Sequence, residues 1–205
     1  MLDYGCGSGG FQEITMDRRH LASWLMQNGN GKSVGVDINP ENIMLAKRRI
    51  RNGPRFVVAD GRSLPFRDGC FDVVHEFGVL HHMRGYGDGL REIARVLKFG
   101  GRLLLTESVD NDPLFYIFRC ILGSWQGDKI SSLFDSEALD EQLERCFSIK
   151  VRRYYWRFII SDFLRMCNVE PRASLVFNDV VSKMLTYIRL DKYACCHYYV
   201  EATKL

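Results

Sequence analysis

Short apolar runs alternate with helical patterns along the first hundred residues of the chain. The apolar runs are rich in Val and Leu and almost continuous in hydrophobicity, as expected of strands that are covered on both faces. They predict strands at residues 32–38, 55–60, 71–80 and 101–108, and the segments between them predict helices at residues 11–27, 41–51 and 88–97. Strands that alternate with helices favour an α/β fold with a parallel, doubly wound sheet.

Residues with strong capping preferences predict boundaries for two of these helices. Asn39 is a candidate N-cap of the second helix, and Pro40 would stand at its first helical position, where the missing N–H of proline costs nothing. In the run "KFGG", Gly100 is expected to end the third helix, because glycine readily adopts the left-handed conformation of a helix stop.

The second half of the chain predicts fewer elements. A helix is expected near residues 135–145, followed by two aromatic-rich strand candidates, "FSIKVRRYYWRF" (147–158) and "YACCHYYVEATK" (193–204). A helical stretch at about residues 160–190, broken near Pro171, separates the two strand candidates. Since the last two strands of such a sheet often form a hairpin at its edge, we interpret this stretch as an insertion. Residues 1–205 are expected to form a single domain.

Bulk composition narrows the class of function only slightly. Hydrophobic residues make up 46% of the chain and charged residues 26%, and the net charge of +3 is spread along it, which disfavours nucleic acid as a partner. The seven cysteines include no CxxC pair and no His/Cys spacing typical of zinc, so no metal site is expected. No apolar run reaches the ~18 residues of a membrane span, and no signal peptide is visible. A cytoplasmic enzyme or binding protein is the resulting expectation.

The N-terminal stretch "MLDYGCGSGG" places a glycine-rich turn directly after a short strand. Glycines there allow a tight turn and let a ligand approach the backbone closely. Gly5, Gly7 and Gly10 match a GxGxxG dinucleotide pattern, but the same stretch also matches DxGxGxG. Asp3 discriminates between the two, because a carboxylate beside the turn would repel a pyrophosphate. It would suit a ligand that carries an ammonium and a sulfonium group.

Two further aspartates end neighbouring predicted strands. Asp37 closes the second strand and Asp60 closes the third. In an open parallel sheet these positions lie on the edge where ligands bind. One carboxylate can accept from ribose hydroxyls and the other from an adenine amino group, with charge-assisted hydrogen bonds of roughly 1.5–3 kcal/mol each. Together with Asp3 they favour a positively charged nucleoside ligand.

These motifs resemble the class I S-adenosylmethionine-dependent methyltransferases, in the branch that acts on small molecules, quinones and lipids. The matching segments are "LDYGCGSGG", "VGVDINPENIMLAKRR", "FVVADGRSLPF", "FDVVHEFGVLHH" and "LREIARVLKFGGRLLLTES", in the family's order. The resemblance implies a Rossmann-like methyltransferase fold: a mostly parallel seven-stranded sheet with an antiparallel C-terminal edge strand. It also implies a cofactor-binding half at residues 1–108 and a substrate-side half at residues 109–205.

Carried over by position, the resemblance implies S-adenosylmethionine as the cofactor and assigns its contacts. The glycine turn and Asp3 would hold the methionine part, Asp37 would bind both ribose hydroxyls, and Asp60 would accept from the adenine amino group. Ile38 would pack beside the adenine, and the Gly61 amide would donate to the ring. The full implied set is Asp3, Gly5, Cys6, Gly7, Gly9, Asp37, Ile38, Asp60, Gly61 and His75.

The chain departs from the family pattern at three places. Phe99 replaces the proline of the usual "KPGG", and the insertion at residues 160–190 is unusual in a minimal member. The start at Met1 leaves about three residues for the first strand, so we expect a fragment or a misplaced start that lacks the usual N-terminal helical segment. Two alternatives to an active methyltransferase stay open. One is a cofactor-binding but inactive domain that acts through a partner, and the other is an NAD-dependent oxidoreductase, which Asp3 and Asp60 argue against.

Methyl transfer from a sulfonium is an in-line displacement, and its main requirement is an acceptor placed behind the methyl group. A base is needed only for an acceptor that must lose a proton. Side chains at strand ends are the candidates: first His81 and Glu76, then His75, His82 and Glu107. The fourth strand ends in "HEFG" and lacks the Asn/Asp-Pro-Pro-aromatic run that goes with exocyclic amines of nucleobases, so O- or C-methylation is favoured.

The C-terminal half offers a hint about the acceptor. The segment "DPLFYIFRCILGSW" (112–125) is apolar on nearly every side of a helix, and "RRYYWRFIISDFLRM" (152–166) mixes arginine with aromatic and aliphatic residues. One interpretation is a pocket or membrane-facing rim for a small-molecule or lipid-like acceptor, with the protein at the membrane periphery. The alternative is an ordinary lid helix and edge strand. Stacking on single-stranded nucleic acid is disfavoured, because no wider basic field accompanies these residues.

Overall fold

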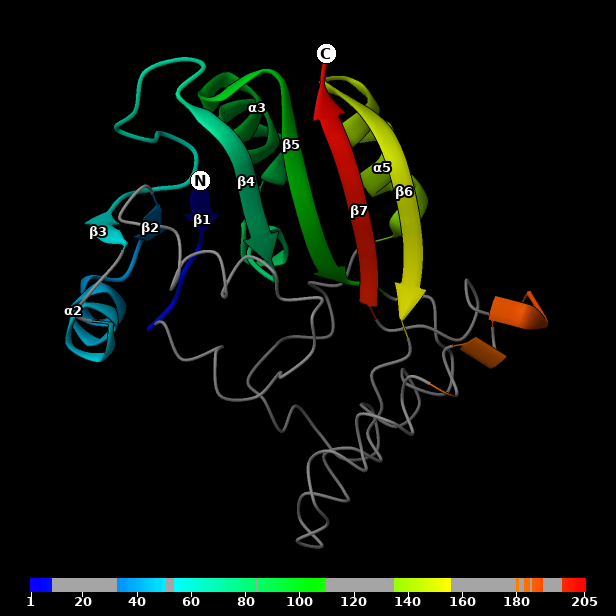
Figure 1. Ribbon diagram of the computed structural model, residues 1–205, viewed down its shortest axis with the longest axis horizontal. Helices are drawn as coiled ribbons and strands as arrows, with labels where there is room; N and C mark the ends of the chain where they lie inside the picture. The colour runs from blue at the N-terminus through cyan, green and yellow to red at the C-terminus, as the bar shows by residue number, and fades with distance from the viewer. Residues whose placement is uncertain are drawn as a thin grey trace, which may run out of the picture.

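Seven strands form one sheet in the order β3-β2-β1-β4-β5-β7-β6 (Figure 1). The computed structural model describes residues 1–8, 33–50, 54–83, 85–109, 135–155, 180, 183–184, 186–189 and 197–205. The strands are β1 (Leu2–Tyr4), β2 (Val34–Asp37), β3 (Arg55–Val58), β4 (Phe71–Phe77), β5 (Leu97–Ser108), β6 (Phe147–Tyr155) and β7 (His197–Lys204). The described helices are α2 (Pro40–Arg49), α3 (Tyr86–Val96) and α5 (Ser136–Glu144), with a 3₁₀ helix η3 at Leu80–His82.

The sheet is doubly wound and mostly parallel, as the sequence predicted. Parallel pairs join β3, β2, β1, β4 and β5, whereas β7 is antiparallel to both of its neighbours, β5 and β6. The predicted antiparallel C-terminal strand is therefore β7, and β6 lies outermost beside it. The chain order reverses between β1 and β4, which pair directly. In sheets of this kind, ligands bind at the carboxyl ends of the strands at such a reversal.

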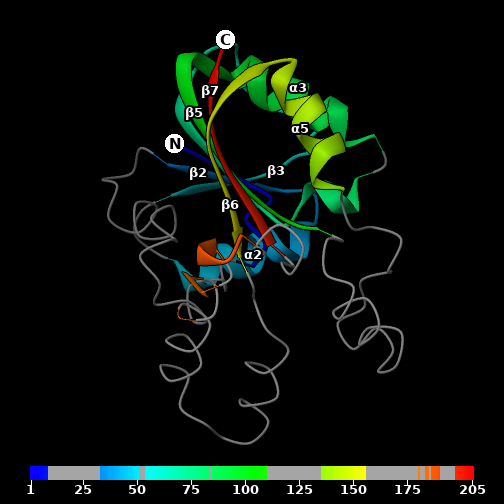
Figure 2. The same cartoon turned by 90° about the vertical axis from the view of Figure 1, so that its right-hand side faces the viewer.

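The main apolar core lies between the sheet and two helices, α3 and α5, which cover the same face (Figures 1 and 2). Tyr4 and Leu105 come from the sheet, Ile93 from α3 and Leu139 from α5, and all four side chains are buried. Burial of each large apolar side chain stabilises the fold by roughly 1.5–3 kcal/mol. A smaller cluster holds α2 against β2 and β3.

The predicted start of α2 is confirmed. Asn39 is its N-cap, and the Asn39 side chain accepts a hydrogen bond of 2.9 Å from the Glu41 backbone N–H. Pro40 is the first residue of the helix. The N-cap Asp135 of α5 accepts from the Glu137 N–H in the same way, at 2.9 Å. Short polar side chains ahead of a helix thus set these two boundaries through a local interaction.

The prediction that Gly100 ends the third helix was wrong. That helix, α3, ends at Val96, and Leu97 already has extended backbone angles. Gly100 has a φ of 71° inside β5, where the pairing with β4 jumps from Leu97 to Arg102. The positive φ of this glycine therefore lies at an irregularity in the pairing of β5 with β4. The strand β5 begins at Leu97, earlier than the predicted residue 101.

Other predicted boundaries shift by a few residues or fall outside the described segments. The strand expected at residues 71–80 ends at Phe77, because Gly78, with a φ of 64°, turns the chain into η3. The helix expected at residues 11–27 lies outside the described residues, as does most of the predicted insertion at residues 160–190. Within the segments that the structure describes, no helix is both long and apolar enough to cross a membrane.

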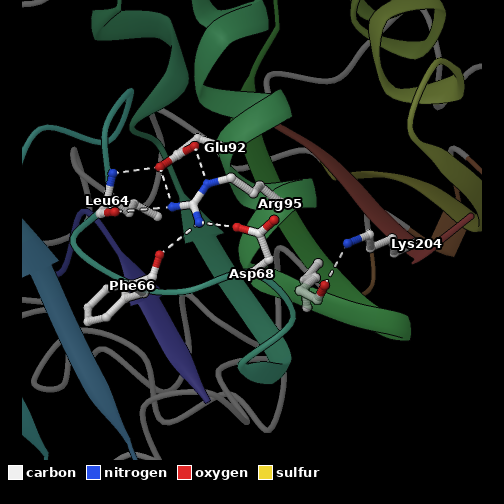
Figure 3. A network of polar contacts seen from close by, with 7 residues as sticks. Leu64, Phe66, Asp68, Glu92, Arg95 and Lys204 are labelled. Carbon is white, nitrogen blue, oxygen red and sulfur yellow. Dashed lines mark hydrogen bonds and ion pairs between the residues drawn. The ribbon is translucent and has the colours of Figure 1, made fainter.

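Arg95 of α3 clamps the loop between β3 and β4 (Figure 3). Its guanidinium donates to both carboxylate oxygens of Glu92, to the carbonyl oxygens of Leu64 and Phe66, and to Asp68 Oδ1 at 2.6 Å. Glu92 in turn accepts from the Leu64 N–H at 2.7 Å. These Arg95 hydrogen bonds, which we call the clamp, hold the loop in place. The loop begins where the chain leaves β3 at the carboxyl edge of the sheet.

Arg95→Ala should lower the free energy of unfolding by about 1–3 kcal/mol, because it leaves two carbonyl groups and Glu92 without their charged donor. Urea unfolding of the two proteins measures the difference. Arg91→Ala on the same helix removes only an exposed ion pair with Asp88, so this control should change the stability by about 0.5 kcal/mol or less. Equal losses in the two variants would contradict the clamp.

Candidate functional site

The turn after β1 packs closely against the segment after β4. Gly5 has a φ of 75°, and a Cβ at this position would lie 2.2 Å from Cγ2 of Val79, so no larger residue fits. Gly7 has a φ of 54°, and a Cβ there would meet no described atom within 4 Å. The Cys6 N–H donates to the Val36 carbonyl oxygen at 2.8 Å and ties the turn to β2. The turn is therefore fixed at Gly5, and the described residues leave space beside Gly7.

Asp37, at the end of β2, is hydrogen-bonded to this turn. Its Oδ2 accepts from the Gly7 N–H at 2.9 Å. Its Oδ1 accepts from the Asn39 N–H at 2.8 Å and from Asn42 Nδ2 at 3.3 Å. The carboxylate thus stands next to the open side of Gly7 and is oriented by the first turn of α2. A ligand with vicinal hydroxyls that lay along the turn would meet this carboxylate.

Asp3 and His75 form a hydrogen-bonded pair at the reversal of strand order. They are register partners on β1 and β4, and Asp3 Oδ1 lies 3.0 Å from His75 Nδ1. The His75 ring stacks with the ring of Phe77, with centroids 6.5 Å apart. Both members of the pair are partly buried. Two of the predicted cofactor residues are thus brought into direct contact, in a way that the sequence alone did not indicate.

The predicted adenine side lies after β3. Asp60 forms a close ion pair with Arg62, at 2.7 Å between Oδ2 and Nη2, and the hydrogen bond from this side chain lowers the pKa of Asp60. Gly61 is buried, and a Cβ on it would lie 2.2 Å from the Tyr4 hydroxyl oxygen. Ile38 is 65% exposed at the end of β2. An adenine bound here would meet an exposed apolar side chain and would share Asp60 with Arg62.

Two predicted cofactor residues need separate comment. Cys6 is buried, and burial raises the pKa of its thiol, so this side chain is a neutral packing group. Its contribution to the turn comes from the backbone. Gly9 lies outside the described residues. Among the residues that the structure does describe, no group of His, Cys, Asp and Glu side chains could hold a metal ion.

Two glutamates meet in the core where β4 and β5 end. Glu76 and Glu107 are both fully buried. Glu76 Oε1 accepts from the Val79 N–H at 2.7 Å and from the Leu80 N–H at 3.4 Å, and Glu107 Oε1 accepts from the same Leu80 N–H at 2.6 Å. Both carboxyl groups therefore hold the turn that enters η3.

Of the two buried carboxyl groups, Glu76 has a clearly shifted pKa. Burial, and then the neighbouring charge of Glu107, raise the pKa of Glu76 well above its usual range. Glu76 Oε2 has no hydrogen-bond partner among the described residues. Two negative charges in one desolvated place are unfavourable, so the pair keeps one proton, on Glu76.

His81 is the first of the two predicted catalytic residues, and its partner is Glu107. Glu107 Oε2 lies 2.6 Å from His81 Nδ1. The His81 side chain is 7% exposed, and the centroids of the His81 and His82 rings are 4.0 Å apart. Glu107 was only one of several strand-end candidates in the sequence. What singles Glu107 out is the pairing of β4 with β5, which brings it to His81, 26 residues earlier in the sequence.

Comparisons with known proteins agree on one family. A family model described as a methyltransferase domain matches residues 2–105. A phthiotriol/phenolphthiotriol dimycocerosates methyltransferase of Mycobacterium ulcerans is 35% identical over 108 residues, which cover 52% of this chain and 36% of that protein. A 2-methyl-6-phytyl-1,4-hydroquinone methyltransferase of Synechocystis is 29% identical over 157 residues, 70% of this chain and 44% of that protein.

A solved structure is similar to this chain in fold. The S-adenosylmethionine-dependent methyltransferase from Methanosarcina mazei superposes with a TM-score of 0.64 at 20% identity, covering 100% of this chain and 91% of that one. This likeness confirms the predicted Rossmann-like fold. The chain spans less than half the length of the two curated relatives described above.

Gly5→Ala should destabilise the protein by about 2–5 kcal/mol, because the new methyl group adds a steric clash with the stiff Val79 side chain to the cost of a positive φ. Gly100→Ala is the matched control: its φ is similar, but a Cβ there meets no described atom within 4 Å, so only about 1–2 kcal/mol is expected. Urea unfolding of both variants checks the difference. A smaller loss for Gly5→Ala than for Gly100→Ala would be inconsistent with the contact.

The raised pKa of Glu76 predicts a specific pH dependence of stability. An unfolded glutamate titrates near pH ~4.3, whereas native Glu76 holds its proton to higher pH. Between the two pKa values the native state binds more protons than the unfolded state, so the free energy of unfolding falls as pH rises. Glu76→Gln lacks this titration, and its stability relative to the wild type should therefore increase from about pH 4 upward.

Unfolding free energies of the wild type and Glu76→Gln at several pH values measure this difference. Glu41→Gln, which alters an exposed glutamate, is the control for loss of a carboxyl group. A difference that stays constant or shrinks as the pH rises would show that Glu76 is ionised in the native protein.

Proposed function

The chain belongs to the class I S-adenosylmethionine-dependent methyltransferases, and from that premise we propose that it transfers a methyl group from S-adenosylmethionine to a small-molecule or lipid-like acceptor. The observation that carries the proposal is the contact between Asp37 and the Gly7 N–H, at 2.9 Å, beside an open glycine turn. It puts a carboxylate and half-buried glycine backbone at the carboxyl edge of the sheet, beside the reversal of strand order, where this fold binds its ligand.

The cofactor fits the side chains that surround the turn. The space beside Gly7 admits the methionine part against the backbone, and Asp37 accepts from the ribose hydroxyls. Asp3, oriented by His75, supplies negative charge on the methionine side. Ile38 offers apolar surface to the adenine, and Asp60 accepts from its amino group. When bound, the cofactor supplies an electrophilic methyl group on a positively charged sulfur.

The chain's own residues position the reactants and exclude water. Gly5 keeps the turn closely packed on Val79, which fixes the distance between the cofactor turn and the segment that carries His81. We propose that His81 contacts the methyl acceptor. Glu76, the other predicted catalytic residue, is fully buried and hydrogen-bonded to the turn, so it acts by holding that turn. Positioning of this kind is a main source of rate acceleration in a direct displacement.

The proposed acceptor follows from the relatives. Their names include a phthiotriol lipid and a phytyl hydroquinone, which are hydrophobic molecules that bear hydroxyl groups. We propose an acceptor of the same kind for this chain, with contact at a membrane surface as the route by which such a molecule reaches the site. The segments that suggested this contact, residues 112–125 and 156–166, lie outside the described residues.

The two alternatives are less well supported. A nicotinamide dinucleotide would place its pyrophosphate beside the turn, close to Asp3, whose charge repels it. An inactive, partner-dependent domain has no need of a histidine held 2.6 Å from a buried carboxylate next to the turn. Both alternatives predict a different response to the ligands in the experiment that follows.

S-adenosylmethionine and S-adenosylhomocysteine should each raise the melting temperature, whereas NAD should not. A ligand at 100 times its Kd adds about 2.7 kcal/mol, which corresponds to a rise of about 5–10 °C for a chain of this size. Asp37→Asn should remove most of the rise. Asp72→Asn is the matched control, since Asp72 is an exposed aspartate on the same sheet that pairs with Lys98, away from the turn. A shift with NAD alone, or with neither sulfur nucleoside, would refute the proposal.

A further inference from the structure

We propose that Arg62 is a specificity-determining residue of the cofactor site, because its side chain occupies the carboxylate that an adenine amino group needs. Arg62 has to give up a contact with Asp60 before Asp60 accepts from the amino group, so the arginine weakens the binding of adenine nucleosides. The inference rests on the proposed function, since the contact between Asp60 and adenine is taken from it. It adds a role for Arg62 and predicts which purines the site prefers.

The Asp60 carboxylate is fully occupied by Arg62. Its Oδ1 accepts from the Arg62 backbone N–H at 2.9 Å and from Arg62 Nε at 3.1 Å. Its Oδ2 accepts from the same Nε at 3.2 Å and from Nη2 at 2.7 Å. The two oxygens of a carboxylate offer about four acceptor sites, and these contacts use all of them. An incoming amino group therefore has to replace a contact that the arginine makes.

Asp60 does not need the Arg62 side chain to keep its place in the loop. The Arg62 backbone N–H holds the carboxylate through Oδ1, and the Ser63 N–H donates to the Asp60 carbonyl oxygen at 2.9 Å. Gly61, between Asp60 and Arg62, is buried, and a Cβ on it would lie 2.2 Å from the Tyr4 hydroxyl oxygen. Backbone contacts and close packing thus fix the acceptor, and the guanidinium competes for it.

The guanidinium can leave Asp60 at low cost. The Arg62 side chain is 49% exposed and the Asp60 side chain 34% exposed, so water solvates both groups when they separate. Exposed ion pairs of this kind contribute little net free energy. The fraction of molecules in which Asp60 is released sets the apparent affinity for an adenine ligand. The competition is therefore modest, and it is removed when the arginine side chain is removed.

The pair also determines how the site distinguishes purines at position 6. Adenine carries an amino group there, which donates, whereas hypoxanthine carries a carbonyl oxygen, which accepts. The released Asp60 carboxylate attracts the amino group and repels the carbonyl oxygen. Arg62 does the opposite, because a guanidinium has five N–H donors and no acceptor. With Arg62 in place, the preference for adenine over hypoxanthine is smaller than Asp60 alone would give.

Calorimetric binding of two ligands tests this competition. The first is S-adenosylhomocysteine, and the second is S-inosylhomocysteine, in which the carbonyl oxygen replaces the amino group. Arg62→Ala should lower the Kd of S-adenosylhomocysteine by about two- to fivefold, because the carboxylate is then free. The same variant should raise the Kd of S-inosylhomocysteine by about three- to tenfold, because a donor is lost and the carboxylate is uncovered. Damage to the loop would instead weaken both ligands.

Two further variants control for charge and for the identity of the acceptor. Arg67→Ala removes an exposed arginine from the same loop, and it should leave both Kd values within about twofold of the wild type. In a background that carries Asp60→Asn, adding Arg62→Ala should change the Kd of S-adenosylhomocysteine by less than about twofold. A full effect of Arg62→Ala in that background would mean that Arg62 does not act through Asp60.

Arginine side-chain NMR observes the exchange directly. With ¹⁵N-arginine labelling, the Arg62 Nε signal is assigned from its loss in Arg62→Ala. Saturating S-adenosylhomocysteine should move this signal away from its position in the free protein, and the Arg67 Nε signal should stay in place. An Arg62 signal that does not respond to S-adenosylhomocysteine would overturn the proposal.

Binding by the wild type separates failure of this inference from failure of the proposed function. A wild type that binds neither S-adenosylmethionine nor S-adenosylhomocysteine would refute the proposed function itself. A wild type that binds S-adenosylhomocysteine, together with an Arg62→Ala variant that binds it equally well or more weakly, would overturn the role of Arg62 while the cofactor assignment stands.

Discussion

The close approach of Gly5 to Val79 is the constraint on which the site depends. It joins the turn after β1 to the segment after β4, and a single added methyl group would lie 2.2 Å from the valine. Val79 is β-branched and therefore has little freedom to move away. This contact positions two parts of the site relative to each other. One is the backbone of the glycine turn after β1, and the other is His81 after β4.

The same segment is held from within the core by two carboxyl groups. Glu76 accepts from the Val79 N–H, and both Glu76 and Glu107 accept from the Leu80 N–H. The Val79 side chain thus packs against Gly5, and the Val79 and Leu80 amides are hydrogen-bonded to the two carboxyl groups. A rigid turn of this kind suits a reaction whose rate depends on placement, because an error of even an ångström in the approach of acceptor to methyl group is costly.

Sequence patterns predicted the sheet, the glycine turn and the strand-end aspartates because these depend on local features. Strand runs are short, almost continuous apolar stretches, Asn39 caps its own helix, and Asp37 is the last residue of its strand. The boundary at Gly100 was missed because its positive φ answers to an irregular pairing with β4, which is a long-range effect. The partnership of Glu107 with His81 also lay beyond prediction, since it requires the register of two strands.

The buried carboxyl groups are the clearest sign that this core is not built for stability alone. An apolar pair of similar size would pack in the same place without the desolvation of two acids, and such replacements are often neutral or stabilising. Glu76 Oε2, without a hydrogen-bond partner among the described residues, adds to that cost. An apolar pair would not accept hydrogen bonds from the Val79 and Leu80 amides and would leave His81 Nδ1 without the Glu107 carboxyl group beside it. Glu76 and Glu107, which make this core less stable than an apolar pair would, are therefore the residues that hold the Val79–Leu80 turn beside the candidate site.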